Sequence, residues 1–233
     1  MSNAPILSVR AMAEMIDLPA YQTMRVLHDQ KFPRREPQLF RVTYYQPVLR
    51  AIRAYYSKDN DEGMLHSARE LIQAGLPKGS RRRHNLRVLD AFAASEQAKR
   101  HLEITRSARA RVPVSTDADN EATANTMPID GAVHLRVAFD LVAIERDANG
   151  APGQTRRIFY NTRVVAMEPE MARVTLELTH WALERAGRPT PMSNLELVDL
   201  TADRVYHVTR RRARTIERTR ATAAMIEALW PTL

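Results

Sequence analysis

The chain of 233 residues is 44% hydrophobic and 27% charged, which is typical of a globular protein with one sizeable core. Its formal net charge of +8 is consistent either with a polyanionic partner or with a solvated surface. It contains no cysteine, which excludes disulfides, thiolate zinc sites and a cysteine nucleophile. No apolar run approaches the roughly 18 residues of a membrane span, and the N-terminus has no signal-like segment, so we expect a cytoplasmic protein without a membrane partner.

The chain opens with two predicted short helices. Ser8 is the expected N-cap of the first, whose inward positions are Val9, Met12, Ala13 and Ile16. The second follows a turn at 17–19, and its expected inner face comprises Tyr21, Met24 and Leu27. Such a pair resembles a helix-turn-helix, in which the side chains facing a DNA groove would be Gln22, Thr23, Arg25 and His28. The alternative is an ordinary start to a helical subdomain.

Three further helices are expected before residue 100. One begins near Pro47, one covers about 62–73, and one carries Leu86, Leu89 and Phe92 on its inner face. The segment "KGSRRRHN" between the last two is expected to be a turn. It contains three consecutive arginines that we predict to bind nucleic acid: Arg81, Arg82 and Arg83. We treat residues 1–100 as a helical N-terminal region with a possible helix-turn-helix.

Beyond residue 101 the pattern changes from helical to alternating, which predicts strands. Residues 101–114 are expected to form an edge strand, 115–128 a polar loop and 132–147 one long strand. A hairpin at 148–154 leads to a returning strand that contains "RRIFYNTR". A helix opening at Pro169, two short strands around a turn at 201–203 and a C-terminal helix complete the order.

This order, together with the stretches "AFDLVAIE" and "IFYNTR", resembles the core of the PD-(D/E)XK nuclease superfamily, closest to its RecB-like branch. The resemblance covers residues 101–233. It implies an α+β protein with a restriction-endonuclease-like αβββαβ-type core behind the helical N-terminal region. In such nucleases, an acid on the second core strand joins an acid on the third to hold a divalent metal, and a lysine aligns the water. Here the corresponding positions are Asp140, Asn161 and Arg163.

These three residues predict a degenerate catalytic site. Mg²⁺ prefers anionic oxygens in a near-octahedral array, whereas Asn161 offers a neutral carbonyl. Arg163 cannot act as a base, and its fixed charge would repel a metal but suits an ion pair with Asp140. We therefore expect no catalysis, no bound metal and no cofactor. The alternative is an active Mg²⁺-dependent nuclease that uses Asp140 with Glu145 or Glu168.

The strongest binding feature is the segment "RVYHVTRRRARTIERTR", residues 204–220, in which Glu217 is the only acid. Arg210, Arg214 and Arg218 are predicted to share one helical face, with Arg211 beside them. A charge run usually marks a solvated helix, but the shortage of acids favours a nearby anion. The sequence thus predicts a non-catalytic protein that binds DNA or RNA, positioning it for a protein partner. A protein-interaction scaffold with incidental charge is the alternative from another class.

Other chemistries lack their signatures. No pair of histidines has the spacing of zinc ligands. No glycine-rich phosphate loop and no serine nucleophile elbow occur in the sequence. Zinc chemistry and nucleotide hydrolysis are therefore not expected.

Overall fold

The computed structural model describes residues 5–32, 44–58, 60–98, 126–146 and 151–233. Its helices are α1 (Val9–Met15), α2 (Ala20–Lys31), α4 (Gln46–Ser57), α5 (Glu62–Gly75), α6 (Ser80–Ala94), α9 (Pro169–Arg185) and α10 (Ala213–Leu229), with 3-10 turns η1 (Met192–Asn194) and η2 (Trp230–Thr232). Its strands are β1 (Ile6–Ser8), β2 (Thr126–Pro128), β3 (His134–Arg136), β4 (Leu141–Arg146), β5 (Pro152–Asn161), β6 (Leu195–Asp199) and β7 (Arg204–Tyr206).

The described residues form an α+β protein with two mixed sheets. One sheet has the order β1-β3-β2, and the other has the order β4-β5-β6-β7. In the larger sheet, β4 and β5 form the predicted antiparallel hairpin, and β6 lies parallel to β5 after the crossover through α9. The turn at 201–203 is also confirmed, since β6 and β7 pair antiparallel around it and Asp203 has a φ of 46°. The strand predicted at 101–114 lies outside the described residues.

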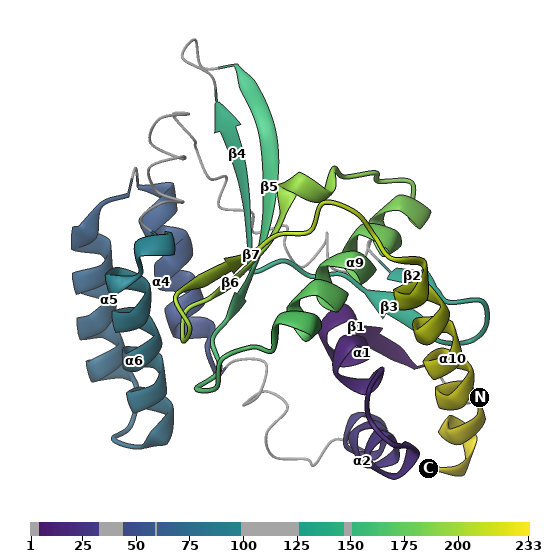
Figure 1. Ribbon diagram of the computed structural model, residues 1–233. Coiled ribbons are helices and arrows are strands. Elements are labelled where there is room, and N and C mark those ends of the chain that lie inside the picture. Colours follow the sequence, from purple (N-terminus) through teal and green to yellow (C-terminus); the bar gives the residue numbers. More distant parts are fainter. Residues whose placement is uncertain (1–4, 33–43, 59, 99–125, 147–150) are drawn as a thin grey trace.

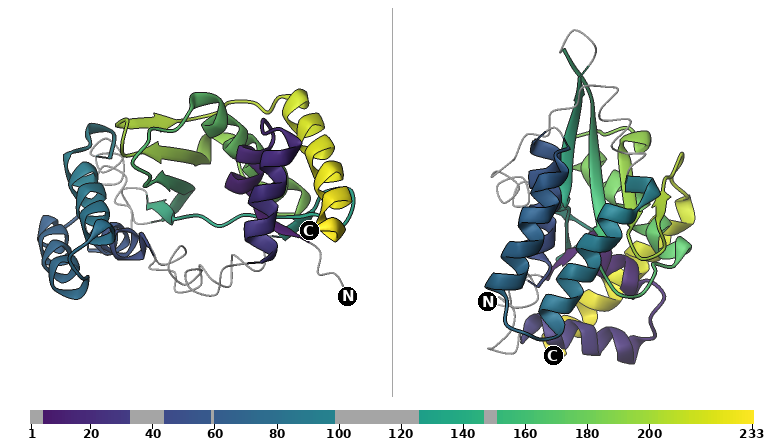
Figure 2. Two further views of the ribbon diagram at one scale, coloured as in Figure 1. Left: turned by 90° about the horizontal axis from the view of Figure 1, so that it is seen from below. Right: turned by 90° about the vertical axis from the view of Figure 1, so that its left-hand side faces the viewer.

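The larger sheet is covered by helices on both faces (Figure 1). On one face, Ile158 and Tyr160 of β5 pack with the bundle of α4, α5 and α6. On the other face, Phe159 belongs to a second core with α1, α9 and the smaller sheet. Figure 2 shows the same two helical groups from below and from the side of the bundle. Among the described helices, none is long and apolar enough to cross a membrane.

The start of the chain belongs to the second core. Ser8 caps α1 as predicted, because its Oγ accepts a hydrogen bond from the backbone N–H of Ala11 at 3.1 Å. Val9 and Met12 are buried, α1 packs on α9, and β1 pairs in parallel with β3. The N-terminal strand and helix are therefore built into the same core as the C-terminal helices.

The predicted inner face of α2 is confirmed at Leu27 and wrong at Tyr21 and Met24. Tyr21 is 69% exposed and Met24 is 37% exposed, whereas Thr23 and Leu27 are completely buried. The small polar residue Thr23 is buried in place of Tyr21 and Met24, so the positions of the apolar residues alone do not decide which side of the helix packs. The packing of α2 against α10 determines which side of the helix is buried, and it leaves the Tyr21 side chain exposed to solvent.

The long strand predicted at 132–147 is two strands in two sheets. β3 ends at Arg136, and β4 begins at Leu141 after a bend at Asp140. Alternate residues from Val133 through Phe139 face the core of α1 and α9, but Leu141 faces the core of the α4–α6 bundle. The alternation is continuous in sequence, and only the chain's passage from one sheet to the other interrupts it.

Two local predictions are also corrected. The polar loop expected at 115–128 ends in strand β2, which pairs antiparallel with β3. The segment "KGSRRRHN" is not a turn throughout, because α6 begins at Ser80. Arg81, Arg82 and Arg83 therefore lie in the first turn of a helix.

A candidate site at the start of strand β4

Asp140 lies where α1, α4 and β5 meet. Its Oδ2 accepts hydrogen bonds from Nη2 of Arg10 at 2.5 Å and from the backbone N–H of Tyr160 at 2.8 Å. Its backbone carbonyl accepts one from Nε of Arg53 at 2.7 Å. Its own N–H donates to the carbonyl of Ile158 at 3.0 Å. This single residue thus ties two helices to the hairpin.

The cation that pairs with Asp140 is Arg10. The sequence favoured Arg163, but Arg163 forms an ion pair with Glu14 instead. Arg10 and Glu14 are one turn apart on α1, so this helix supplies a base to one predicted site residue and an acid to the other. Sequence analysis missed both partners. The only signal was the i, i+4 spacing of an acid and a base on a capped helix.

Asn161 organises the loop that follows β5. It is buried, its Nδ2 donates to the carbonyl of Val165 at 3.1 Å, and its Oδ1 accepts from the N–H of Arg163 at 3.2 Å. Its register partner on β6 is Asp199, a buried carboxylate that sequence analysis also missed. Asp199 accepts the backbone N–H groups of Met167 at 2.5 Å and Thr201 at 2.9 Å. The side chains of Asn161 and Asp199 therefore both stabilise backbone turns through hydrogen bonds.

The residues around Asp140 do not fit a metal ion. Within the described part of the chain, no group of three or more His, Cys, Asp or Glu residues is placed to hold one. Asp140 already binds a guanidinium, whereas Mg²⁺ binds through free carboxylates and keeps several of its waters. Glu168 is exposed at the N-terminus of α9. Glu145 belongs to β4, but its side chain lies outside the described residues.

Two buried tyrosines lie behind Asp140. The hydroxyls of Tyr56 and Tyr160 are 3.5 Å apart, and both side chains are buried between α4 and β5. Burial raises the pKa of both phenols well above the ordinary value of 10.0. Both groups stay neutral near pH 7 and do not supply a base to the site.

The arginines of residues 204–220 are largely paired within the protein. Acids from α9 bind two of them: Glu184 binds Arg211 at 2.7 Å, and Glu170 binds Arg212 at 2.6 Å. Two more are bound by acids from other parts of the chain, Arg218 by Asp17 and Arg220 by Asp130. Glu217 is the only acid within residues 204–220, and the acids that pair with these four arginines come from other parts of the chain.

The predicted face of Arg210, Arg214 and Arg218 does not form. α10 begins at Ala213, so Arg210 precedes the helix, and Arg218 is taken up by its ion pair. Arg210 and Arg214 are exposed and have no acidic partner among the described residues. Arg210 and Arg214 flank the start of α10 and are available to an external anion.

The arginines of α6 lie at its N-terminus. Arg83 is exposed, and Nη1 of Arg82 donates to the carbonyl of Gln73 at 2.9 Å. The first turn contains no acid, and no side chain caps it. The positive end of the helix dipole and these three cations therefore coincide.

His180 of α9 contacts the same arginine segment. Its Nδ1 lies 3.1 Å from Nη1 of Arg211. Burial, followed by the charge of Arg211, lowers the pKa of His180 below its usual 6.5. The hydrogen bond from Arg211 lowers the pKa of Glu184. The neutral imidazole accepts the hydrogen bond of the arginine, and a protonated ring would repel it.

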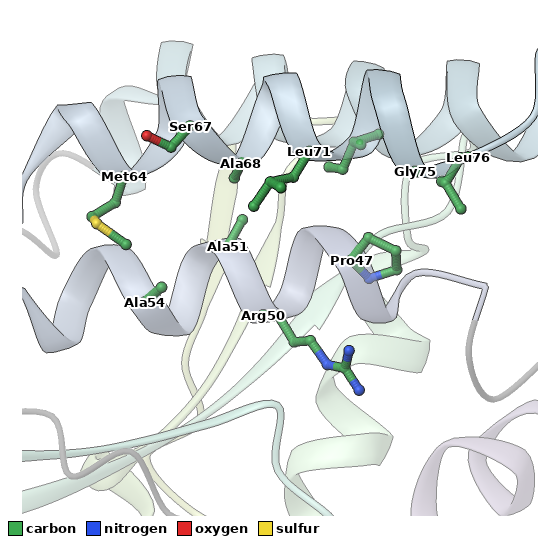
Figure 3. Close-up of a pocket in the computed structure, with 11 residues that line it drawn as sticks. Pro47, Arg50, Ala51, Ala54, Met64, Ser67, Ala68, Leu71, Gly75 and Leu76 are labelled. Carbon is green, nitrogen blue, oxygen red and sulfur yellow. The ribbon is translucent and has the colours of Figure 1, made fainter.

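A groove of about 370 Å³ lies between α4 and α5. Figure 3 shows Met64, Ala68 and Leu71 of α5 facing Ala51 and Ala54 of α4, whereas the guanidinium of Arg50 points away. A ligand site normally combines an apolar lining with a few convergent polar groups. Apart from Ser67 and Arg50, the side chains that line this groove are apolar, and they provide no set of convergent polar groups, so we assign it no ligand.

No protein-family model, curated protein or solved structure matches this chain.

Proposed function

We propose that this chain binds nucleic acid without cleaving it, on a degenerate PD-(D/E)XK-like core, and positions it for a partner. The strand order of the larger sheet supports the proposal. An antiparallel hairpin, a crossover helix and a parallel strand follow one another as β4, β5, α9 and β6. Asp140 accepts the backbone N–H of Tyr160, the neighbour of Asn161, so the position of the first acid lies close to that of the second, as the resemblance implies.

The ion pairs around Asp140 support the non-catalytic part. The carboxylate expected to hold a metal binds Arg10, and the residue in the lysine position binds Glu14. A metal would have to displace a guanidinium from a side chain that is only 17% exposed. Mg²⁺ dehydrates reluctantly and is usually bound through one or two carboxylates together with substrate phosphates, so a carboxylate already paired with a guanidinium is a poor ligand for it.

The observation that carries the binding part is the placement of arginines at helix N-termini. Acids are the residues that stabilise a first turn, and cations there cost about 0.3–1 kcal/mol each near the positive end of the dipole. α6 nevertheless begins with Arg81, Arg82 and Arg83, and α10 begins between Arg210 and Arg214, with no acid in either first turn. A phosphate group would relieve this repulsion and gain charge-assisted hydrogen bonds.

The experiment is a salt titration of DNA binding. Changing both Arg210 and Arg214 to Gln should lower the slope of log K against log salt by about 1.8, since each lost phosphate contact contributes roughly 0.9. The matched control changes Lys58 and Arg136 to Gln, because both are exposed and lie outside these helix starts. Equal slopes for the two variants would reject Arg210 and Arg214 as phosphate contacts.

A further inference from the structure

The outer face of α2 is an exposed stripe of aromatic and basic side chains. Tyr21 is 69% exposed and Phe32, just after the helix, is 49% exposed. Arg25 and His28 between them are also exposed. Their spacing of four, three and four residues places them on one helical face. We call these four residues the α2 stripe.

The α2 stripe is held in place from behind. Thr23 and Leu27 on the opposite face are fully buried, and α2 packs on α10. At the end of the helix, Nζ of Lys31 donates to the backbone carbonyl of Trp230 at 2.6 Å, and its ammonium lies 5.3 Å from the Trp230 ring centroid. Figure 1 shows α2 beside the C-terminal end of α10, at the edge of the molecule. The exposed rings are therefore presented on an anchored helix.

The electrostatics of the α2 stripe favour an anionic partner. Arg25 has no acidic partner among the described residues. Two acids of the neighbouring segment are already taken, since Glu14 binds Arg163 and Asp17 binds Arg218. The ring of His28 lies 5.2 Å from that of Phe32 and is tilted by 50° to it, and the Lys31 ammonium lies over the Phe32 ring, 5.6 Å from its centroid. Aromatic rings and basic side chains thus occur together, and Asp29, four residues after Arg25, is the one acid of the helix.

We propose that the α2 stripe is a stacking platform for the bases of single-stranded nucleic acid, an inference that rests on the proposed function. Exposed rings bind unpaired bases face to face, and neighbouring cations bind the backbone phosphates. In a duplex the base faces are already stacked on each other, so the rings gain nothing there. The stripe has no preference for particular base edges, because every base has a π-face.

The arrangement does not suit the groove reading of a helix-turn-helix. Of the residues expected to face a groove, Arg25 and His28 are exposed, but Thr23 is fully buried. The side chain of Gln22 is engaged, since its Nε2 donates to the hydroxyl of Tyr21 at 2.8 Å. The exposed residues of α2 are Ala20, Tyr21, Met24, Arg25 and His28.

The test measures binding of the full chain to fluorescent oligothymidine and to a duplex of equal length. Changing Tyr21 or Phe32 to Ala should weaken oligothymidine binding about 5- to 150-fold for each lost ring, with duplex binding unchanged. Tyr21→Phe should retain wild-type affinity, because it keeps the ring. Leu71→Ala is the matched control, since Leu71 is a 73% exposed apolar residue on α5.

The outcomes separate this inference from the proposed function. Wild-type affinity for oligothymidine in both alanine variants would overturn the stacking platform and leave the proposed function standing. Equal losses on single strand and duplex would overturn the single-strand preference. Failure of the wild-type protein to bind either probe at low salt would overturn both. Because the two rings are exposed, circular dichroism should show wild-type folding in every variant.

Discussion

Arg10 and Asp140 form an ion pair of 2.5 Å between residues that are 130 positions apart in the sequence. The same carboxylate oxygen accepts the N–H of Tyr160, and the Arg10 guanidinium lies 4.8 Å from the centroid of the Phe159 ring. The pair joins the first helix to the hairpin of the larger sheet. It also occupies the carboxylate that the sequence resemblance assigns to a metal.

The first prediction concerns this pair. Asp140→Ala should lower the free energy of unfolding by about 1–3 kcal/mol, because it leaves Arg10 and the Tyr160 N–H without their acceptor. Urea denaturation measures the change. Asp90→Ala is the control, since Asp90 pairs with Arg69 on an exposed surface, where such pairs contribute about 0–1 kcal/mol. Equal effects of the two substitutions would show that Asp140 has no special structural role.

A second prediction concerns Asn161. Asn161→Asp should destabilise the protein by about 1–3 kcal/mol, because the carboxylate cannot donate to the Val165 carbonyl and faces Asp199 across the β5–β6 ladder. Thermal unfolding with and without Mg²⁺ checks this. A variant that unfolds at or above the wild-type temperature would contradict the structural role of the amide.

The buried carboxylate of Glu177 provides a third prediction. It accepts from Arg212 at 3.0 Å and from Arg173 at 3.2 Å and is completely buried. Glu177→Gln should cost about 2–4 kcal/mol, somewhat reduced because Arg212 is 34% exposed. Glu170→Gln removes the exposed partner of the same arginine and should cost less than about 1 kcal/mol. The reverse ranking in chemical denaturation would rule out the buried pair as the main anchor of this segment.

The fourth prediction is a pH dependence due to His180. Its pKa in the folded protein is below 6.5, so between the two values the unfolded chain binds more protons and stability rises with pH. The destabilisation should appear as pH falls below about 6.5 and stay constant once pH is below the folded pKa. Glu184 also has a lowered pKa, and the stability that its carboxylate contributes is lost separately, at more acidic pH. His180→Gln should flatten the change between about pH 7 and pH 5, and an unchanged slope would exclude the histidine as its cause.

Features that depend on neighbouring residues could be predicted from the sequence. Ser8 as a cap and the turn at 201–203 follow from short-range spacing. The order of the β4–β5 hairpin and the crossover helix α9 follows from the same spacing of apolar residues. These elements are set by local geometry, which the sequence displays directly.

Long-range relationships could not be predicted. Nothing in the sequence near Asp140 identifies Arg10 as its partner, and the acids that bind Arg211 and Arg212 lie on α9. The bend at Asp140 interrupts an alternation that continues unchanged through both strands. The rotation of α2 depends on α10, almost the whole chain away. In each case, tertiary packing chooses between solutions that are locally equivalent.

The most direct test of the account measures binding and cleavage together. Wild-type protein is incubated with labelled single- and double-stranded DNA, with EDTA, Mg²⁺ or Mn²⁺. The account predicts salt-dependent binding that does not require metal and substrates that remain intact under every condition. Metal-dependent nicking by the wild-type protein that disappears in folded Asp140→Ala would contradict it and assign the chain an active nuclease site.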